Sequence, residues 1–150
     1  MSEIIVRSRI EIEASTAEAW AVVADHGYDM RWREDVERVS HTPAGLVAVG
    51  TRIVEHGRSL DRRRTIETVV GSVVPEHRFT WSATSGADAE GSRMVTAARP
   101  GFVWVEQQFV VRSGGMFARL MRPLRQRSLQ HVSDRSLQRL EVLFDRLSGA

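Results

Sequence analysis

The sequence predicts an α+β fold in which a curved antiparallel sheet of roughly seven strands wraps around one long C-terminal helix. Three observations lead to this prediction. Short alternations of apolar and polar residues fill residues 36–112, two short helical segments precede them, and one stripe with helical periodicity follows Gly114 and Gly115. Because the connections between the alternating segments are short, consecutive strands should pair antiparallel.

A first strand and two short helices are expected at the start of the chain. In "IIVRSRIEIEA", residues 4–14, apolar or small side chains alternate with charged ones, as in a strand with one buried face. Ser15 then offers an N-cap, and Glu18 stands three residues later, at the spacing of a capping box. Gly27 marks the end of this helix, and a second short helix or turn is expected over residues 28–31.

Six further strands follow, separated by turns rich in Gly, Pro, Asp and Ser. Their expected positions are residues 36–42, 50–58, 62–74, 77–84, 91–98 and 102–112. Turns of this length join neighbouring strands, so the predicted sheet is a meander.

The C-terminal segment is predicted to be one long, interrupted helix. Its apolar stripe consists of Phe117, Leu120, Met121, Leu124, Val132, Leu140, Leu143 and Leu147. Pro123 lacks a backbone N–H, so a kink or restart is expected near residues 121–123. The small or polar residues Ser128, His131 and Ser136 fall near the stripe. A helix that roofs a cavity tolerates such residues, so we expect a ligand-binding hollow between helix and sheet.

Composition restricts the function classes. The 150 residues are expected to form one domain, residues 1–150. The chain has no cysteine, no apolar stretch long enough to span a membrane and no secretory signal at its start, so we expect a cytoplasmic protein. All 21 basic residues are arginine, acidic residues are mixed among them, and the net charge is only +2, which argues against nucleic-acid binding. The sequence leaves open whether the chain forms a homodimer.

Several stretches together resemble the START-like (Bet v 1-like, SRPBCC) superfamily, in its polyketide cyclase/dehydrase and lipid-transport subgroup. The stretches are "IEIEASTAEAWAVVADHGYDMRW" at 10–32, "VGTRIVEHGR" at 49–58, "GFVWVEQQFVV" at 101–111 and "LQRLEVLF" at 137–144. The resemblance covers essentially the whole chain. Relatives commonly have proline after the first strand, whereas this chain has Ala14 followed by Ser15, a conservative change at a helix start.

The resemblance implies a helix-grip fold and a cavity, but it leaves two functions open. One is binding or transport of a hydrophobic or amphipathic, lipid- or polyketide-like small molecule. The other is a polyketide cyclase, aromatase or dehydratase that uses acid and base groups of the same cavity, without a metal or nucleotide cofactor. Clustered Glu, His and Arg at the cavity base would favour the enzyme, whereas a lone polar group would favour the carrier.

Large apolar residues of the strands and the long helix form the pool of expected ligand contacts. The pool comprises Trp32, Phe79, Trp81, Met94, Trp104, Phe109, Phe117, Met121 and His131. Trp32 stands among charged residues in "DMRWREDVERV", so its indole is expected to pack inward against the short helices and the C-terminal helix. Two roles remain open for Trp32, a core plug and a part of the ligand mouth.

The acid–base candidates are Glu106, His56, Arg58 and His131. Glu55 and His56 would suit acid–base chemistry by type, but neighbouring strand residues point to opposite faces, so at most one faces the cavity. Glu106 would have a raised pKa if it pointed inward, and would form a cross-strand ion pair if it pointed outward. His131 could face the cavity or be an ordinary structural histidine.

Other chemistries find little support in the sequence. The histidines lack H-x-x-x-H and H-x-H spacing, so no zinc motif exists, and no G-x-S-x-G motif marks a nucleophilic serine. The arginines between residues 119 and 127 flank apolar residues and could form an amphipathic membrane-surface segment. The favoured interpretation is a core-facing apolar stripe with a solvated arginine face.

Overall fold

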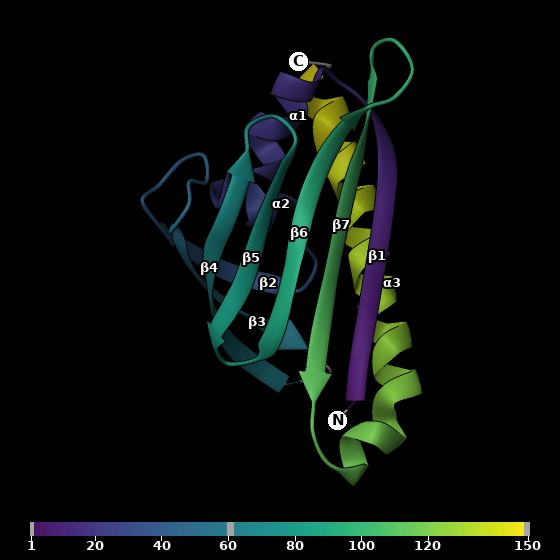
Figure 1. Ribbon diagram of the computed structural model, residues 1–150. Coiled ribbons are helices and arrows are strands. Elements are labelled where there is room, and N and C mark those ends of the chain that lie inside the picture. Colours follow the sequence, from purple (N-terminus) through teal and green to yellow (C-terminus); the bar gives the residue numbers. More distant parts are fainter. Residues whose placement is uncertain (1, 60–61, 149–150) are drawn as a thin grey trace.

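The computed structural model describes residues 2–59 and 62–148, which form one antiparallel sheet, three short helical segments and one long helix (Figure 1). The strands are β1 (Ser2–Glu13), β2 (Val36–Thr42), β3 (Arg52–Ser59), β4 (Arg62–Val74), β5 (Arg78–Ser85), β6 (Asp88–Ala97) and β7 (Phe102–Ser113). The helices are α1 (Thr16–Val23), the 3₁₀ turn η1 (His26–Tyr28), α2 (Asp29–Trp32) and α3 (Met116–Ser148). This arrangement confirms the predicted helix-grip α+β fold.

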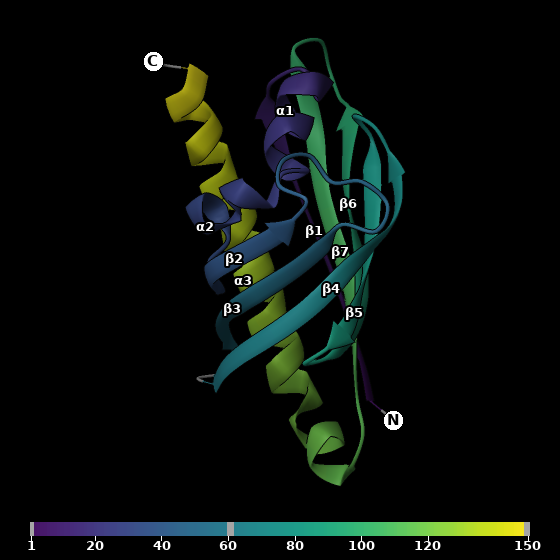
Figure 2. The same ribbon diagram turned by 90° about the vertical axis from the view of Figure 1, so that its left-hand side faces the viewer.

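In the sheet, β2 to β7 form a meander, and β1 is added at the edge next to β7. The strand order is β1-β7-β6-β5-β4-β3-β2, and every pair is antiparallel. Register shifts occur in β2 between Val36 and Arg38 and in β4 between Val70 and Ser72. Such irregularities bend a strand and increase its twist, which helps the sheet curl around α3. Figure 2 shows β2, β3 and β4 crossing in front of α3 while β7 and β1 lie along it.

Local sequence signals explain the short elements. The Ser15 hydroxyl accepts a hydrogen bond from the Glu18 amide at 3.1 Å, and the Glu18 carboxylate accepts one from the Ser15 amide at 3.0 Å. This capping box is the predicted one, and it fixes where α1 begins after β1. Residue 57 has to be glycine, because a Cβ there would stand 2.0 Å from the carbonyl oxygen of Asp35. The chain after α2 therefore runs directly over β3.

The packed core occupies one end of the space between sheet and helix. It joins residues of the strands, such as Val70, Val95 and Val105, to Leu140 of α3 and Trp20 of α1. The Trp20 and Phe79 rings meet edge to face, with centroids 6.1 Å apart. α3 packs mainly on β1, and it also contacts β7 and α2.

Two sequence-based boundaries need correction. α3 is continuous from residue 116 to residue 148, so the helix does not stop and restart near residues 121–123 as one form of the prediction held. Pro123 and Arg119 are both exposed, so water can reach the carbonyl group that loses its helical partner. β6 begins at Asp88, three residues earlier than expected, because Asp88 and Ala89 continue the pairing with β7.

Trp32 packs inward, as predicted from its charged surroundings. Its side chain is fully buried within the core, on a helix that contacts α3. The Arg93 guanidinium lies 4.9 Å from the centre of its ring. Trp32 is a core plug, and the alternative in which it lines a ligand mouth is not what the structure contains.

Replacing Trp32 by alanine should therefore destabilise the fold rather than merely weaken a ligand contact. Loss of a buried tryptophan costs about 3–5 kcal/mol through lost burial and the cavity left behind. Urea unfolding measures this free energy. The matched control is Trp104→Ala on the outer face of the sheet, where we expect a loss of at most about 1 kcal/mol. Equal losses for the two variants would contradict the plug.

Candidate functional site

A cavity fills the other end of the space between the sheet and α3. Its volume is about 180 Å³; a single water needs about 10–15 Å³ on this measure, so the space suits a larger guest. The cavity-lining residues of a strand are followed, in one direction along that strand, by residues of the packed core. On β7, for example, Val111, Phe109 and Gln107 line the cavity, whereas Val105 belongs to the core.

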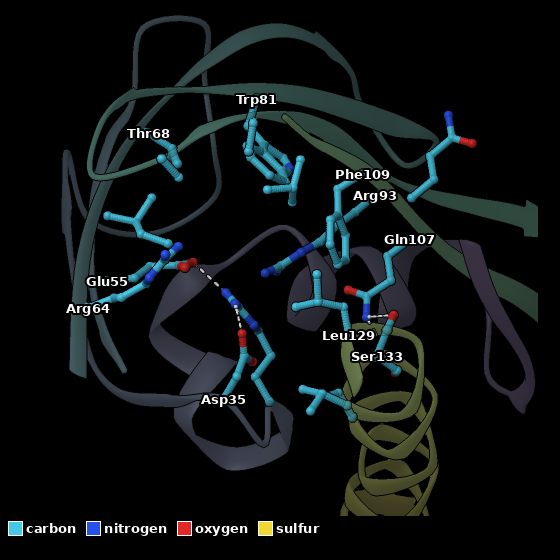
Figure 3. A pocket seen from close by; sticks show the side chains of 18 of the residues that line it. Asp35, Glu55, Arg64, Thr68, Trp81, Arg93, Gln107, Phe109, Leu129 and Ser133 are labelled. Atoms are coloured by element: carbon cyan, nitrogen blue, oxygen red, sulfur yellow. Dashed lines mark hydrogen bonds and ion pairs between the residues drawn. The ribbon is translucent and has the colours of Figure 1, made fainter. Parts of the chain in front are cut away.

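The wall of the cavity is apolar and partly aromatic. Trp81 of β5 and Phe109 of β7 face Leu129 of α3 across it (Figure 3). Gly91 of β6 lies against both residues, since a Cβ there would stand 2.7 Å from Cζ2 of the Trp81 ring and 2.8 Å from Cβ of Phe109. The missing side chain lets the Trp81 ring lie close to β6, which keeps the space in front of that ring open.

The floor of the cavity rests on a buried ion pair between α2 and β6. The two terminal nitrogens of Arg93 donate to the two carboxylate oxygens of Asp29 at 2.9 and 2.7 Å, and one of them also donates to the Val23 carbonyl at 3.0 Å. Asp29 is fully buried and Arg93 is 5% exposed. Burial alone would raise the pKa of Asp29, but attraction to Arg93 and its other cationic neighbours outweighs burial and lowers the pKa to about 2.

Arg33 extends this pair into a network of charges. Its guanidinium donates to Asp29 at 3.3 Å and to Asp35 at 3.0 Å, and it also pairs with Glu55 of β3. Burial lowers the pKa of Arg33, but the carboxylates of Asp35 and Glu55 outweigh it and hold the pKa above its ordinary value. Figure 3 labels the two carboxylates Glu55 and Asp35, and its dashed lines mark their ion pairs.

His26 of η1 is a neutral, buried member of the floor. It is 4% exposed, and its ring meets Phe79 edge to face at a centroid distance of 5.7 Å. Burial lowers the pKa of His26 to about 3, against the opposing attraction of Asp29. Among the residues that the structure describes, Nδ1 of His26 finds no hydrogen-bond partner. One nitrogen of this ring lies within 4.8 Å of carboxylate oxygens of Asp29 and Glu55.

Arginines gather at the more exposed end of the cavity. Arg58 of β3, Arg64 of β4 and Arg125 of α3 line it there. Within residues 2–59 and 62–148, neither Arg64 nor Arg125 has a carboxylate within ion-pair distance; Arg125 donates to the Ser113 hydroxyl at 2.7 Å. The acids of the cavity are already engaged by Arg33 and Arg93. The opening is therefore electropositive.

The floor is a poor match for a metal ion. Ligand atoms of His26, Asp29 and Glu55 lie within 4.8 Å of one another, a spacing that a cation could bridge. However, Arg93 and Arg33 already neutralise Asp29, and Arg33 also pairs with Glu55. A cation would have to enter next to two guanidinium groups, so we assign no metal to this cluster.

The structure places only part of the predicted ligand pool at the cavity. Trp81 and Phe109 line it, whereas Phe79 and Trp32 are buried in the core. The remaining members of the pool lie outside the lining and are Met94, Trp104, Phe117, Met121 and His131.

The reason for these corrections is the face on which each side chain stands. Trp104 and Met94 alternate with the inward residues of β7 and β6, and the Arg9 guanidinium covers Trp104 at 4.3 Å on the outer face. On α3, Phe117 is 75% exposed, and His131 is exposed on the helix side away from the cavity.

The acid–base candidates separate in the same way. Arg58 lines the cavity opening, but His56 points away and shares a 3.0 Å hydrogen bond with Thr65. Glu106 points outward, 3.8 Å from Arg9, so the outward alternative applies. Glu55 is the member of the Glu55–His56 pair that faces the cavity.

The charged floor was missed by sequence reasoning, although one signal for it exists. Arg93 occupies the buried register of β6, two residues from Val95 and two from Gly91. A charged residue in such a register needs a buried partner of opposite charge. Asp29 in "DMRW" is that partner, and neither residue was singled out.

Breaking the ion pair from one side should be more costly than removing both charges. We expect Arg93→Met to lower the free energy of unfolding by about 3–5 kcal/mol, because Asp29 is left buried and uncompensated. The double variant Asp29→Asn with Arg93→Met should recover a substantial part of that loss. Urea unfolding of the wild type, both single variants and the double variant gives the coupling. Additive losses would show that the two charges do not interact.

His26 should make the fold sensitive to mild acid. The pKa of His26 is about 3 in the folded protein, against 6.5 ordinarily. Between these two pH values the unfolded chain binds a proton that the folded protein does not, so the stability of the fold decreases as the pH is lowered. Moving from about pH 7 to about pH 4.5 should cost the wild type roughly 2–3 kcal/mol more than His26→Gln. Urea unfolding at both pH values checks this difference. Parallel losses in both proteins would contradict a buried, neutral His26.

Comparisons with known proteins agree with this architecture. Residues 3–144 match the family described as polyketide cyclase/dehydrase and lipid transport. No curated protein sequence matches the chain.

Solved structures share the fold at low sequence identity. The Zhui aromatase/cyclase from Streptomyces sp. R1128 superposes with a TM-score of 0.80 at 12% identity, covering 97% of this chain and 95% of that one. TTHA0849 from Thermus thermophilus gives 0.79 at 18% identity, with 96% and 99% covered. A START superfamily protein from Mycobacterium smegmatis gives 0.72 at 13% identity, with 95% and 98% covered. The chain belongs to the polyketide cyclase/dehydrase and lipid transport family.

Proposed function

We propose that this protein binds an amphipathic small molecule in the cavity between the sheet and α3. The observation that carries the proposal is the combination of an apolar, aromatic wall with a charged floor. An aromatic or polyene body would pack against Trp81, Phe109 and Leu129. Its oxygen-bearing end would accept hydrogen bonds from the guanidinium groups of Arg33 and Arg93.

Several features support a polar end on the ligand. A purely apolar guest would leave the floor charges desolvated without new partners, which costs free energy. Gln107 donates to the Ser133 hydroxyl at 2.8 Å, so its side chain is held at the cavity surface (Figure 3). We place the polar end toward this floor and the body toward the opening.

The first test uses native mass spectrometry and a fluorescent probe. Protein purified from its own host should carry a small molecule that denaturation releases. Anilinonaphthalene sulfonate, which is aromatic and anionic, should bind the emptied protein, and Trp81→Ala should weaken its binding about tenfold. The matched control is Trp104→Ala on the outer face, with binding within about twofold of the wild type. No host ligand together with no probe binding would refute the proposal.

A second candidate function is acid–base catalysis of the cyclase or dehydratase type. The observation that favours it is the convergence of His26 and Glu55 at one end of the cavity, beside the guanidinium of Arg33. Glu55 would accept a proton from a carbon next to a carbonyl group, and Arg33 or Arg93 would stabilise the enolate oxygen. This cluster weighs against a simple carrier more than a lone polar group would.

Exchange of ketone protons tests this chemistry without knowledge of the natural substrate. Acetophenone in D₂O should exchange its methyl protons faster in the presence of the protein. Glu55→Gln should reduce that acceleration roughly 100-fold, as expected for loss of a general base, while probe binding stays within about threefold of the wild type. An unchanged exchange rate in Glu55→Gln would remove Glu55 from the mechanism and leave ligand binding as the function.

Location and further partners belong to the same proposal. We place the protein in the cytoplasm, since the chain has no cysteine, and in a bacterium, since similar structures come from Thermus, Streptomyces and Mycobacterium. We also propose that its ligand is lipid- or polyketide-like and that it does not bind nucleic acid, because acidic residues are mixed among its arginines.

A further inference from the structure

The first turns of α3 expose a row of large apolar side chains. Met116 is 87% exposed, Phe117 75%, Leu120 74% and Leu124 58%. At helical spacing these four residues fall within an arc of about 100°. Figures 1 and 2 show this part of α3 extending past the end of the sheet. We call it the α3 tip, residues 116–127.

The favoured interpretation of this stripe as core-facing is wrong. All buried residues of α3 lie between Ser133 and Phe144, where the helix crosses the sheet. The exposed row of the α3 tip lies on the helix face opposite β1, which the tip meets instead through Arg122 and Gln126. Exposed apolar groups in such a row usually mark a surface that binds a membrane or another molecule.

The charged residues of the α3 tip itself all have one sign. Arg119, Arg122, Arg125 and Arg127 belong to the α3 tip, and the sequence has no Asp or Glu between residues 107 and 133. Within the part of the chain that the structure describes, none of the four arginines forms an ion pair. Arg122 instead donates to the Glu3 carbonyl at 2.8 Å.

The α3 tip also adjoins the opening of the cavity. Arg125, Ser128 and Leu129 line the cavity; Arg125 follows Leu124 directly, and the other two lie about one helical turn further along. A surface that covered the α3 tip would therefore lie next to the route by which a ligand enters.

We propose that the α3 tip docks on the surface of an anionic lipid bilayer. The apolar row would enter the boundary between headgroups and acyl chains, and the arginines would contact lipid phosphates. A second copy of the chain fits less well, because a symmetric contact would bring the two sets of arginines together. Docking is peripheral, since none of the described helices has the length and apolar character to cross a bilayer.

Vesicle flotation tests this docking independently of the cavity ligand. The wild type should float with vesicles that contain about one third phosphatidylglycerol. Binding should be at least about tenfold weaker to pure phosphatidylcholine, and roughly 0.5 M salt should also weaken it. Phe117→Ser with Leu120→Ser should reduce binding to anionic vesicles at least about tenfold. Arg119→Gln with Arg127→Gln should reduce it about fivefold per arginine.

The control removes equally exposed apolar residues from the other end of the same helix. Val142 is 48% and Leu147 is 47% exposed, so Val142→Ser with Leu147→Ser should bind like the wild type. Circular dichroism and probe binding in the cavity show that each variant is folded. The proposal is overturned if the wild type ignores anionic vesicles or if the Phe117, Leu120 variant binds them normally. It is also overturned if sedimentation shows a lipid-independent dimer that the same substitutions dissociate.

Discussion

A single buried ion pair, Asp29 with Arg93, determines how the short helices meet the sheet. Arg93 reaches from β6 to the carboxylate that begins α2 and to the carbonyl oxygen of Val23 at the end of α1. It also lies against the rings of Trp32 and Phe79. Charges removed from water are stable only with nearly complete pairing. The positions of α1, η1 and α2 therefore have to satisfy this one guanidinium.

The same pair gives the cavity its polarity. The Arg33 guanidinium lies between Asp29 of this pair and Glu55 of β3, and both Arg33 and Glu55 line the cavity. The wall opposite is aromatic and depends on the bare backbone of Gly91. A site with these two sides orients a guest, which is the requirement common to a selective carrier and to a cyclase. The fold is therefore compatible with either function, and the chemistry depends on the floor.

Much of the architecture follows from local patterns in the sequence. The alternation in "IIVRSRIEIEA" and the Ser15–Glu18 capping box predicted β1 and α1, and the short turns predicted the meander. The lining of the cavity was harder to predict because β7 is apolar on both faces. Alternation places Trp104 and Phe109 on opposite faces, but it does not tell which of the two points into the cavity. The Asp29–Arg93 pair joins residues 64 positions apart, a distance at which periodicity carries no information.

The division of the molecule into a packed end and a hollow end links ligand binding to conformational stability. At the packed end, Val70, Val95, Val105 and Leu140 exclude water from between sheet and helix. At the hollow end, the same sheet and helix enclose the cavity, so fewer apolar side chains pack against one another there. A bound guest would supply the missing contacts and stabilise the folded state in proportion to its concentration and affinity. The empty protein is thus a fold with an incomplete core, and local opening should begin at the end where Trp81 and Phe109 lack a partner.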